Sequence, residues 1–145
     1  MKINSSIELS YLAGFFDGEG CISILHNKHS RGWTFTCTVA TAGGYMPTLF
    51  CLNFGGRLRV AQRKRGGHPI TYWVVCHMKA LNFLEIILPY LRLKKPQAEV
   101  AIKFQKKISA SHIAGHIPHR LSGEEQILRE ADVILMKQLK EQSYQ

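Results

Sequence analysis

Two carboxylates, Asp17 and Glu19, stand close together in an otherwise basic stretch of the sequence. They are the only acidic residues between Glu8 and Glu85, an interval that also holds the basic residues Lys28, Arg31, Arg57, Arg59, Arg63, Lys64, Arg65 and Lys79. Carboxylate oxygens are ligands that Mg²⁺ prefers, and a positive field attracts polyanions such as nucleic acid. The pattern suggests a polyanion partner and a functional reason to keep the two acids; a basic solvated surface is the alternative explanation of the charge.

The two acids lie at the foot of a predicted helix. Ser5-x-x-Glu8 is a capping box, and it precedes apolar residues at helical spacing: Leu9, Leu12, Ala13 and Phe16. We expect this helix to end near Asp17, before Gly18. Negative charge at a helix C-terminus is opposed by the macrodipole, so Glu19 is predicted to need a cation, and a divalent metal is the obvious candidate.

The rest of the chain predicts the order α-β-β-α-β-β-α-α-α. Strands are expected at 21–27, 33–41, 57–61 and 70–76, and further helices at 47–54, 81–91, 96–108 and 122–142, with a loop at 109–121. In the second strand, threonines at 34, 36 and 38 alternate with apolar residues, so one sheet face is polar and helices must cover the other. This is a mixed α+β fold with an αββαββα core and additional C-terminal helices.

Length and composition fit one globular domain over 1–145, with 46% hydrophobic residues and a net charge of +9. No apolar run could span a membrane and no secretory signal precedes Glu8, so we expect an intracellular protein without a membrane partner. The cysteines are too widely spaced for a structural zinc site. We expect Cys21, Cys37 and Cys76 to be small buried hydrophobes.

Residues 12–20, LAGFFDGEG, resemble the signature of the LAGLIDADG homing endonucleases and their maturase relatives. A second tract, from Asn82 to Ala98, resembles the helix–loop–helix that closes the single-motif members of that family. The resemblance covers roughly residues 5–108. It implies a homodimer whose motif helices pack together and whose paired antiparallel sheets form a saddle along DNA. The implied dimer interface consists of Leu12, Ala13, Gly14, Phe16 and Asp17.

The resemblance also implies a catalytic site. Glu19 of each copy, with the backbone carbonyl of Gly18, would bind Mg²⁺ beside a scissile phosphate, and Mn²⁺ or Ca²⁺ could replace it for binding. Lys94 matches the family's basic residue near that phosphate, where it would offset developing charge. Thr41, and after it Tyr45, are the nearest equivalents of the polar residue that orders the water. Glu replaces the more usual Asp at position 19, which shifts the metal slightly.

Outward positions of the strands, hairpin tips and late loop are the candidates for contact with double-stranded DNA. They are Ser23, Asn27, Lys28, Arg31, Thr34, Thr36, Thr38, Arg57, Arg59, Arg63, Lys64, Arg65, His68, Tyr72, His116, His119 and Arg120. Plain β-propensity is an equally good explanation of the threonines, and a solvated edge is the alternative for the arginines. His112, His116 and His119 share helical spacing, but Gly115 and Pro118 interrupt it, so a plain loop is favoured over a metal site.

The function implied is a divalent-metal-dependent homing endonuclease that makes a staggered double-strand break in a long, nearly palindromic site. Two alternatives keep the fold: an intron maturase that holds intron RNA, or a regulator that binds nucleic acid without cutting. A generic RNA-binding protein is disfavoured because no aromatic RNP-like strand or GXXG loop is present. We expect it to act where its DNA is, in a bacterial or archaeal cytoplasm or an organelle matrix or stroma.

Overall fold

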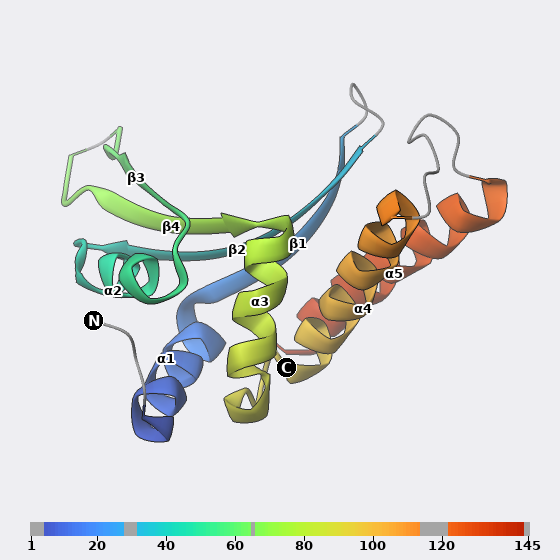
Figure 1. Cartoon of the computed structure of the whole chain (residues 1–145). Helices are drawn as coiled ribbons and strands as arrows, with labels where there is room; N and C mark the ends of the chain where they lie inside the picture. The colour runs from blue at the N-terminus through green and yellow to red at the C-terminus, as the bar shows by residue number, and fades with distance from the viewer. Residues whose placement is uncertain (1–4, 28–31, 65, 114–121, 144–145) are drawn as a thin grey trace.

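A computed structural model of the chain describes residues 5–27, 32–64, 66–113 and 122–143 (Figure 1). Its elements are α1 (Ser6–Glu19), β1 (Gly20–Asn27), β2 (Gly32–Ala42), α2 (Tyr45–Phe54), β3 (Arg57–Ala61), β4 (Ile70–Cys76), α3 (His77–Ile87), a 3-10 turn (Leu88–Tyr90), α4 (Lys95–Ile113) and α5 (Gly123–Gln142). This order confirms the predicted αββαββα core with additional C-terminal helices.

The four strands form one antiparallel sheet in the order β1-β2-β4-β3. The central pairing joins the two hairpins, with Thr38 lying between Cys21 of β1 and Val74 of β4. Figure 1 shows the helices gathered on one side of the sheet, so its other side is open. The predicted division into a packed face and an available face is confirmed.

Alternation along the strands decides which side chains are buried. Phe35, Cys37 and Val39 are fully buried on the helix side, whereas the threonines between them are half-buried on the open side. Burial raises the pKa of the Cys37 thiol well above its ordinary value. The prediction of burial was wrong for Cys21 and Cys76, which are exposed because the register places both on the open face.

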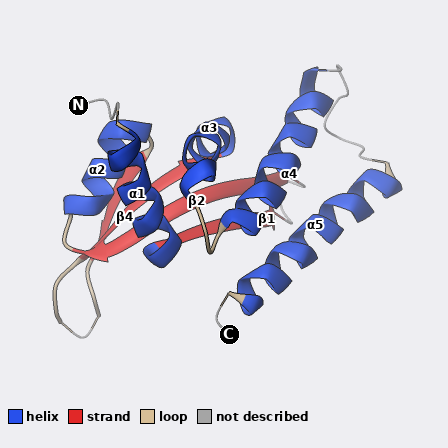
Figure 2. Ribbon diagram, turned by 90° about the horizontal axis from the view of Figure 1, so that it is seen from below, coloured by secondary structure: helices blue, strands red, loops and turns tan. Residues whose placement is uncertain are grey.

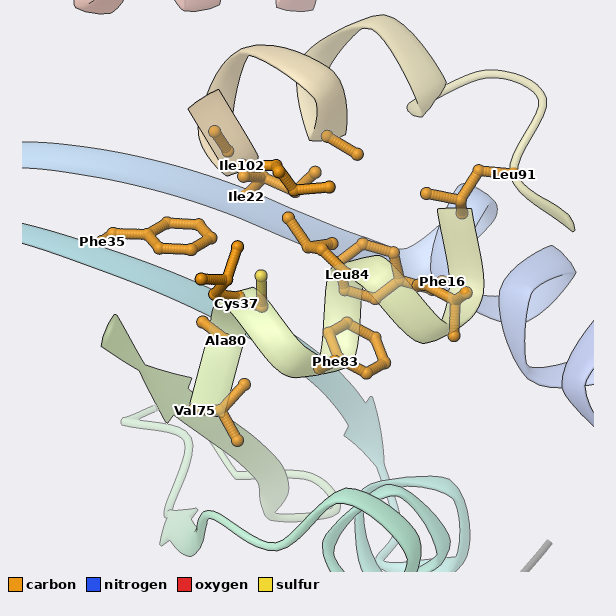
Figure 3. Close-up of a cluster of buried hydrophobic side chains, with 14 of the residues drawn as sticks. Phe16, Ile22, Phe35, Cys37, Val75, Ala80, Phe83, Leu84, Leu91 and Ile102 are labelled. Carbon is orange, nitrogen blue, oxygen red and sulfur yellow. The ribbon is translucent and has the colours of Figure 1, made fainter. Parts of the chain in front are cut away.

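An aromatic cluster joins α2 and α3 to the sheet. The ring of Phe83 lies 4.9 Å from Trp73 and 4.8 Å from Phe54, and Phe50 lies 5.0 Å from Trp73. The indole of Trp73 donates a hydrogen bond of 2.7 Å to the Gly55 carbonyl, so this large side chain is buried without an unpaired N–H. Figure 3 shows part of the core between the sheet and the helices, including Phe83.

Several helix boundaries differ from the prediction. The first helix does not end near Asp17 but continues through Gly18 to Glu19. The fourth begins at Lys95 and extends to Ile113, so positions 109–113 are helical and not part of a loop. The third begins at His77, directly after β4. Both predicted caps are present: Ser5 accepts from the Glu8 N–H, and Ser122 forms a complete capping box with Glu125.

The third strand lies at the sheet edge and is exposed on both faces. Leu58 and Val60 keep 43% and 64% of their surface accessible, so helices do not cover the apolar side of this strand as they do in β2. The edge therefore presents its arginines and its apolar side chains to solvent. Within the residues that the structure describes, no helix combines the length and apolarity needed to cross a membrane.

Candidate active site and nucleic-acid interface

Asp17 connects the end of α1 to the segment that leads into α4. Its carboxylate accepts three backbone N–H groups, from Arg92 at 2.7 Å, Leu93 at 3.2 Å and Lys94 at 2.9 Å. The side chain is only 8% exposed, and burial of a carboxylate is tolerated because these donors replace water. Asp17 therefore holds the 92–94 segment of its own chain in place.

Lys94 is fixed by the same residue from the other side. Its ammonium donates to the Asp17 backbone carbonyl, while its own backbone N–H donates to the Asp17 carboxylate. Partial burial lowers the pKa of Lys94 from its ordinary value of 10.5, and the positive charge of Lys140 lowers it further. Asp17, Cys21 and Glu19 act in the opposite direction. Lys94 is thus a cation held at the C-terminal end of α1.

Glu19 lines a pocket of about 400 Å³ at the C-terminal end of α1. The pocket is lined by residues from α1, β1, the start of α4 and the last turn of α5: Asp17, Gly18, Glu19, Gly20, Cys21, Leu93, Lys94, Gln97, Lys140 and Ser143. Glu19 is exposed there and lies among the charges of two lysines. Because a carboxylate at a helix C-terminus is unfavourable, Lys94 and Lys140 supply the compensating charge within the chain itself.

Lys140 is the member of this pocket that sequence reasoning missed. It comes from the last turn of α5, and its ammonium lies 3.6 Å from the Cys21 thiol. The sequence gives only a weak signal for the role of Lys140, since a lysine near a helix C-terminus is expected on any helix. Gln97, only 2% exposed on α4, was likewise missed as a lining residue.

The pocket includes oxygen donors of the kind that suit a hard cation. Glu19 contributes a carboxylate and Gly18 a carbonyl from the unpaired end of α1, both oxygen donors of the type that Mg²⁺ prefers. Across the described part of the chain, however, no three His, Cys, Asp or Glu side chains are grouped to hold a metal. One chain therefore supplies two oxygen donors toward such a cation at Glu19 and Gly18, and phosphate or water oxygens would complete its shell.

The outward surface of α1 differs from the predicted interface. Leu12, Ala13, Phe16 and Asp17 are buried in the chain's own core, so these four cannot lie on a surface that a second copy contacts. They point inward because Phe16 packs on Phe83 and Asp17 reaches the 92–94 segment. Gly14, the fifth residue of the predicted interface, is exposed.

The exposed strip of α1 consists of residues at i, i+4, i+7 and i+11: Ile7, Tyr11, Gly14 and Gly18. A Cβ atom added at Gly14 or Gly18 would meet no atom within 4 Å. In contrast, a Cβ at Gly20 would overlap the ring of Phe16. Gly20 is therefore required by packing within the chain, whereas Gly14 and Gly18 keep the outer surface of α1 flat.

The open sheet face brings most of the described DNA-binding candidates together. Ser23 lies beside Thr36, Val74 lies between Thr38 and Arg57, and Tyr72 lies beside Arg59. Asn27 and Thr34 continue this face toward the first hairpin tip, and Arg63, Lys64 and His68 are exposed beyond β3. Lys79 of α3, which was not among the predicted DNA contacts, lines a pocket with Arg57 and Arg59.

Some predicted site residues lie elsewhere. Lys28, Arg31, Arg65, His116, His119 and Arg120 fall outside the residues that the structure describes. Thr41 lies at the end of β2 on the helix side, where its hydroxyl donates 2.9 Å to the Gly43 carbonyl. It is not among the residues that line the Glu19 pocket. Its proposed role in ordering water stays a prediction.

Comparison with solved structures identifies the fold. A structure of the homing endonuclease I-CvuI with its target in 2 mM Ca matches with a TM-score of 0.70 at 20% identity, covering 92% of this chain and 82% of that chain. The archaeal intron-encoded homing endonuclease I-Vdi141I, complexed with DNA, matches at 0.69 and 13% identity, covering 94% and 86%. No protein-family model and no curated protein sequence matches the chain.

A second I-CvuI structure, with uncleaved DNA in 2 mM Mg, matches at 0.59 and 24% identity over 72% of this chain and 69% of that chain. The LAGLIDADG homing endonuclease I-GzeII, in complex with its DNA target, is matched over 88% of this chain but only 43% of its own length. The chain has the fold of the LAGLIDADG homing endonucleases, which confirms the resemblance that the motif at 12–20 indicated.

Proposed function

We propose that this chain is a homodimeric, divalent-metal-dependent DNA endonuclease that cuts a long, nearly palindromic site with a stagger. The observation that carries the proposal is the position of Glu19. It projects from the end of α1 into a pocket that also holds Lys94, next to the start of a sheet whose open face carries arginines and threonines. A carboxylate that could bind a metal, Glu19, therefore lies next to a sheet face that could bind nucleic acid.

The open face has the properties of a DNA-reading surface. A two-stranded β-ribbon fits the major groove, arginine can bond guanine bidentately, and threonine methyls can contact thymine. Arg57 and Arg59 share this face with Thr36 and Thr38, across two pairs of strands. Two copies related by a twofold axis would each read one half of a target, which is why the site should be nearly palindromic.

Glu19 and Gly18, from two copies meeting through the exposed strip of α1, would hold the divalent ion. When bound, the ion would supply Lewis-acid stabilisation of phosphate charge and a lower pKa for an attacking water. Lys94 contributes independently, because its ammonium is held at the same pocket and can offset the charge that develops on the phosphate. Asp17 positions Lys94 and does not take part in the chemistry directly.

The decisive experiment separates binding from cutting. Purified protein with Mg²⁺ should linearise a plasmid that carries the target, whereas Glu19→Gln should bind the same DNA with unchanged affinity and leave it uncut. Glu85→Gln is the matched control, because Glu85 is also an exposed carboxylate. It lies on α3, does not line the Glu19 pocket, and pairs with Lys106 of α4. That variant should cut normally.

The other outcomes identify the alternatives. DNA binding without cutting by the unmodified protein would replace the endonuclease with a binding regulator. Tighter binding to intron RNA than to duplex DNA would favour a maturase. Cutting by Glu19→Gln at the unmodified rate would remove the carboxylate from the mechanism.

A further inference from the structure

The outer face of α5 is apolar, although the helix already packs through its opposite face. Arg129, Asp132, Val133 and Met136 point toward the body of the chain, and Met136 is only 3% exposed. The stripe on the other face consists of Ile127 at 66% exposure, Leu128 at 57%, Ala131, Ile134 at 57% and Leu135 at 42%. Figure 2 shows α5 along the outer margin of the molecule, with α4 between it and the sheet.

We infer that this stripe is a self-association surface, on which α5 of a second copy packs in antiparallel orientation. The inference is independent of the proposed DNA cleavage. Helical geometry of 100° per residue places Ala131 and Ile134 at the centre of the stripe, with Leu128 and Leu135 together on one flank. Glu130 and Lys137 lie together on the other flank, and both are exposed.

Charge complementarity selects the second copy as the occupant. Glu130 and Lys137 are seven residues apart, about 10 Å along the helix, which is too far for them to pair within one chain. When two such helices run antiparallel with Ala131 opposite Ile134, Glu130 of each faces Lys137 of the other. The same register places Leu128 opposite Leu135. One offset therefore satisfies the Ala131–Ile134 layer, the apolar flank and the charged flank together, while Ile127 lies opposite the exposed Gln138.

The association is expected to be weak. A stable interface buries about 800 Å² on each partner, and one helix pair provides less than that. The register also brings Glu124 of one copy near Glu141 of the other at the exposed ends, which opposes pairing. Self-association should therefore appear as an average mass that rises with concentration rather than as an assembly of fixed size. It is a separate association step from any pairing through α1.

Sedimentation equilibrium over a concentration series tests the inference with a charge swap. Glu130→Lys places two lysines opposite each other twice per interface, and should weaken the α5-dependent step about tenfold. Lys137→Glu should do the same. The double variant Glu130→Lys with Lys137→Glu recreates both pairs with reversed polarity and should restore association to the unmodified level. Circular dichroism verifies that all three variants keep their helices.

An apolar substitution provides a second readout. Ile134→Glu should abolish the α5-dependent step, and this change should not unfold the chain because the side chain is largely exposed. Ile86→Glu is the matched control, since Ile86 is 46% exposed on α3 and outside the stripe. A mass that does not depend on concentration in the unmodified protein, or a double charge swap that fails to restore association, would overturn the inference.

Discussion

Asp17 holds Lys94 through both ends of the lysine: the carboxylate accepts the Lys94 backbone N–H, and the Asp17 carbonyl accepts its ammonium. This relationship fixes the only buried acid among the described residues to the segment that enters α4. It also explains why Asp17 and Glu19 serve different purposes although only two positions separate them. Asp17 accepts hydrogen bonds from the 92–94 segment, whereas Glu19 lines the pocket.

Replacing Asp17 with Asn should destabilise the chain by about 2 kcal/mol, because hydrogen bonds to a charged acceptor are lost and one donor is left without an equivalent partner. Chemical denaturation measures the free energy of unfolding. Asp132→Asn is the control: it breaks a partly exposed pair with Lys107 at 3.2 Å and should cost about 1 kcal/mol or less. Equal losses in the two variants would refute the account of Asp17 as a buried anchor.

The pH dependence of cleavage should report Lys94. Because burial lowers the pKa of Lys94 below 10.5, kcat/KM should fall on the alkaline side at a pH below that value. The Lys94→Arg variant keeps its charge and should lose this alkaline limb. The free energy of unfolding should change in the opposite sense and rise through the same interval, because there the unfolded chain binds more protons than the folded one. An alkaline limb that persists in Lys94→Arg would assign it to another group.

The glycines of α1 should separate into two kinds. Gly14→Ala and Gly18→Ala place a methyl in open space, so each should stabilise the isolated chain by up to about 1 kcal/mol while weakening pairing through α1. Gly20→Ala should instead destabilise the chain, since its methyl would overlap Phe16.

Gly123→Ala on α5 is the control for the helical propensity effect, because its Cβ also meets nothing within 4 Å. It should stabilise the chain and leave pairing unchanged. The measurements are thermal unfolding and sedimentation, the latter in a Glu130→Lys background that removes association through α5. Unaltered pairing in Gly14→Ala and Gly18→Ala together would exclude this strip from the dimer interface.

The salt dependence of DNA binding should show what Arg59 contacts. If it neutralises one phosphate, Arg59→Gln should lower the slope of log Kd against log salt by about 0.9. If it reads a base, the slope should stay nearly constant while discrimination between target sequences falls. Lys103→Gln, an exposed change on α4 away from the sheet, should alter neither quantity. Insensitivity of both quantities to Arg59→Gln would exclude Arg59 from the interface.

The strand faces were predictable because alternation is a local property. Thr34, Phe35 and their neighbours indicate the packed and open sides of β2 directly from the sequence. The strand order was not readable in the same way, and so the exposure of Leu58 and Val60 on an edge strand was missed. Edge and central strands can share the same alternation and differ only in what covers them.

The site residues that belong to the sequence motifs were predictable. Those that depend on tertiary packing were not. Glu19 and Lys94 follow from the two tracts that resemble the family, and the structure places both at one pocket. The inward side of α1 could not be assigned, because small and apolar residues surround that helix and Ala13 resembles Gly14 in size. Lys140 depends on the length and direction of α5, which are set by its packing on α4.

The two tryptophans offer a built-in optical probe of the molecule. Trp73 sits in the aromatic cluster beside α2 and α3, while Trp33 packs 5.6 Å from Phe104 of α4 at the other end of the sheet. Both face away from the open surface. Single Trp-to-Phe variants would therefore let fluorescence follow the melting of each end separately, and neither signal should be quenched directly by a ligand lying on the strands.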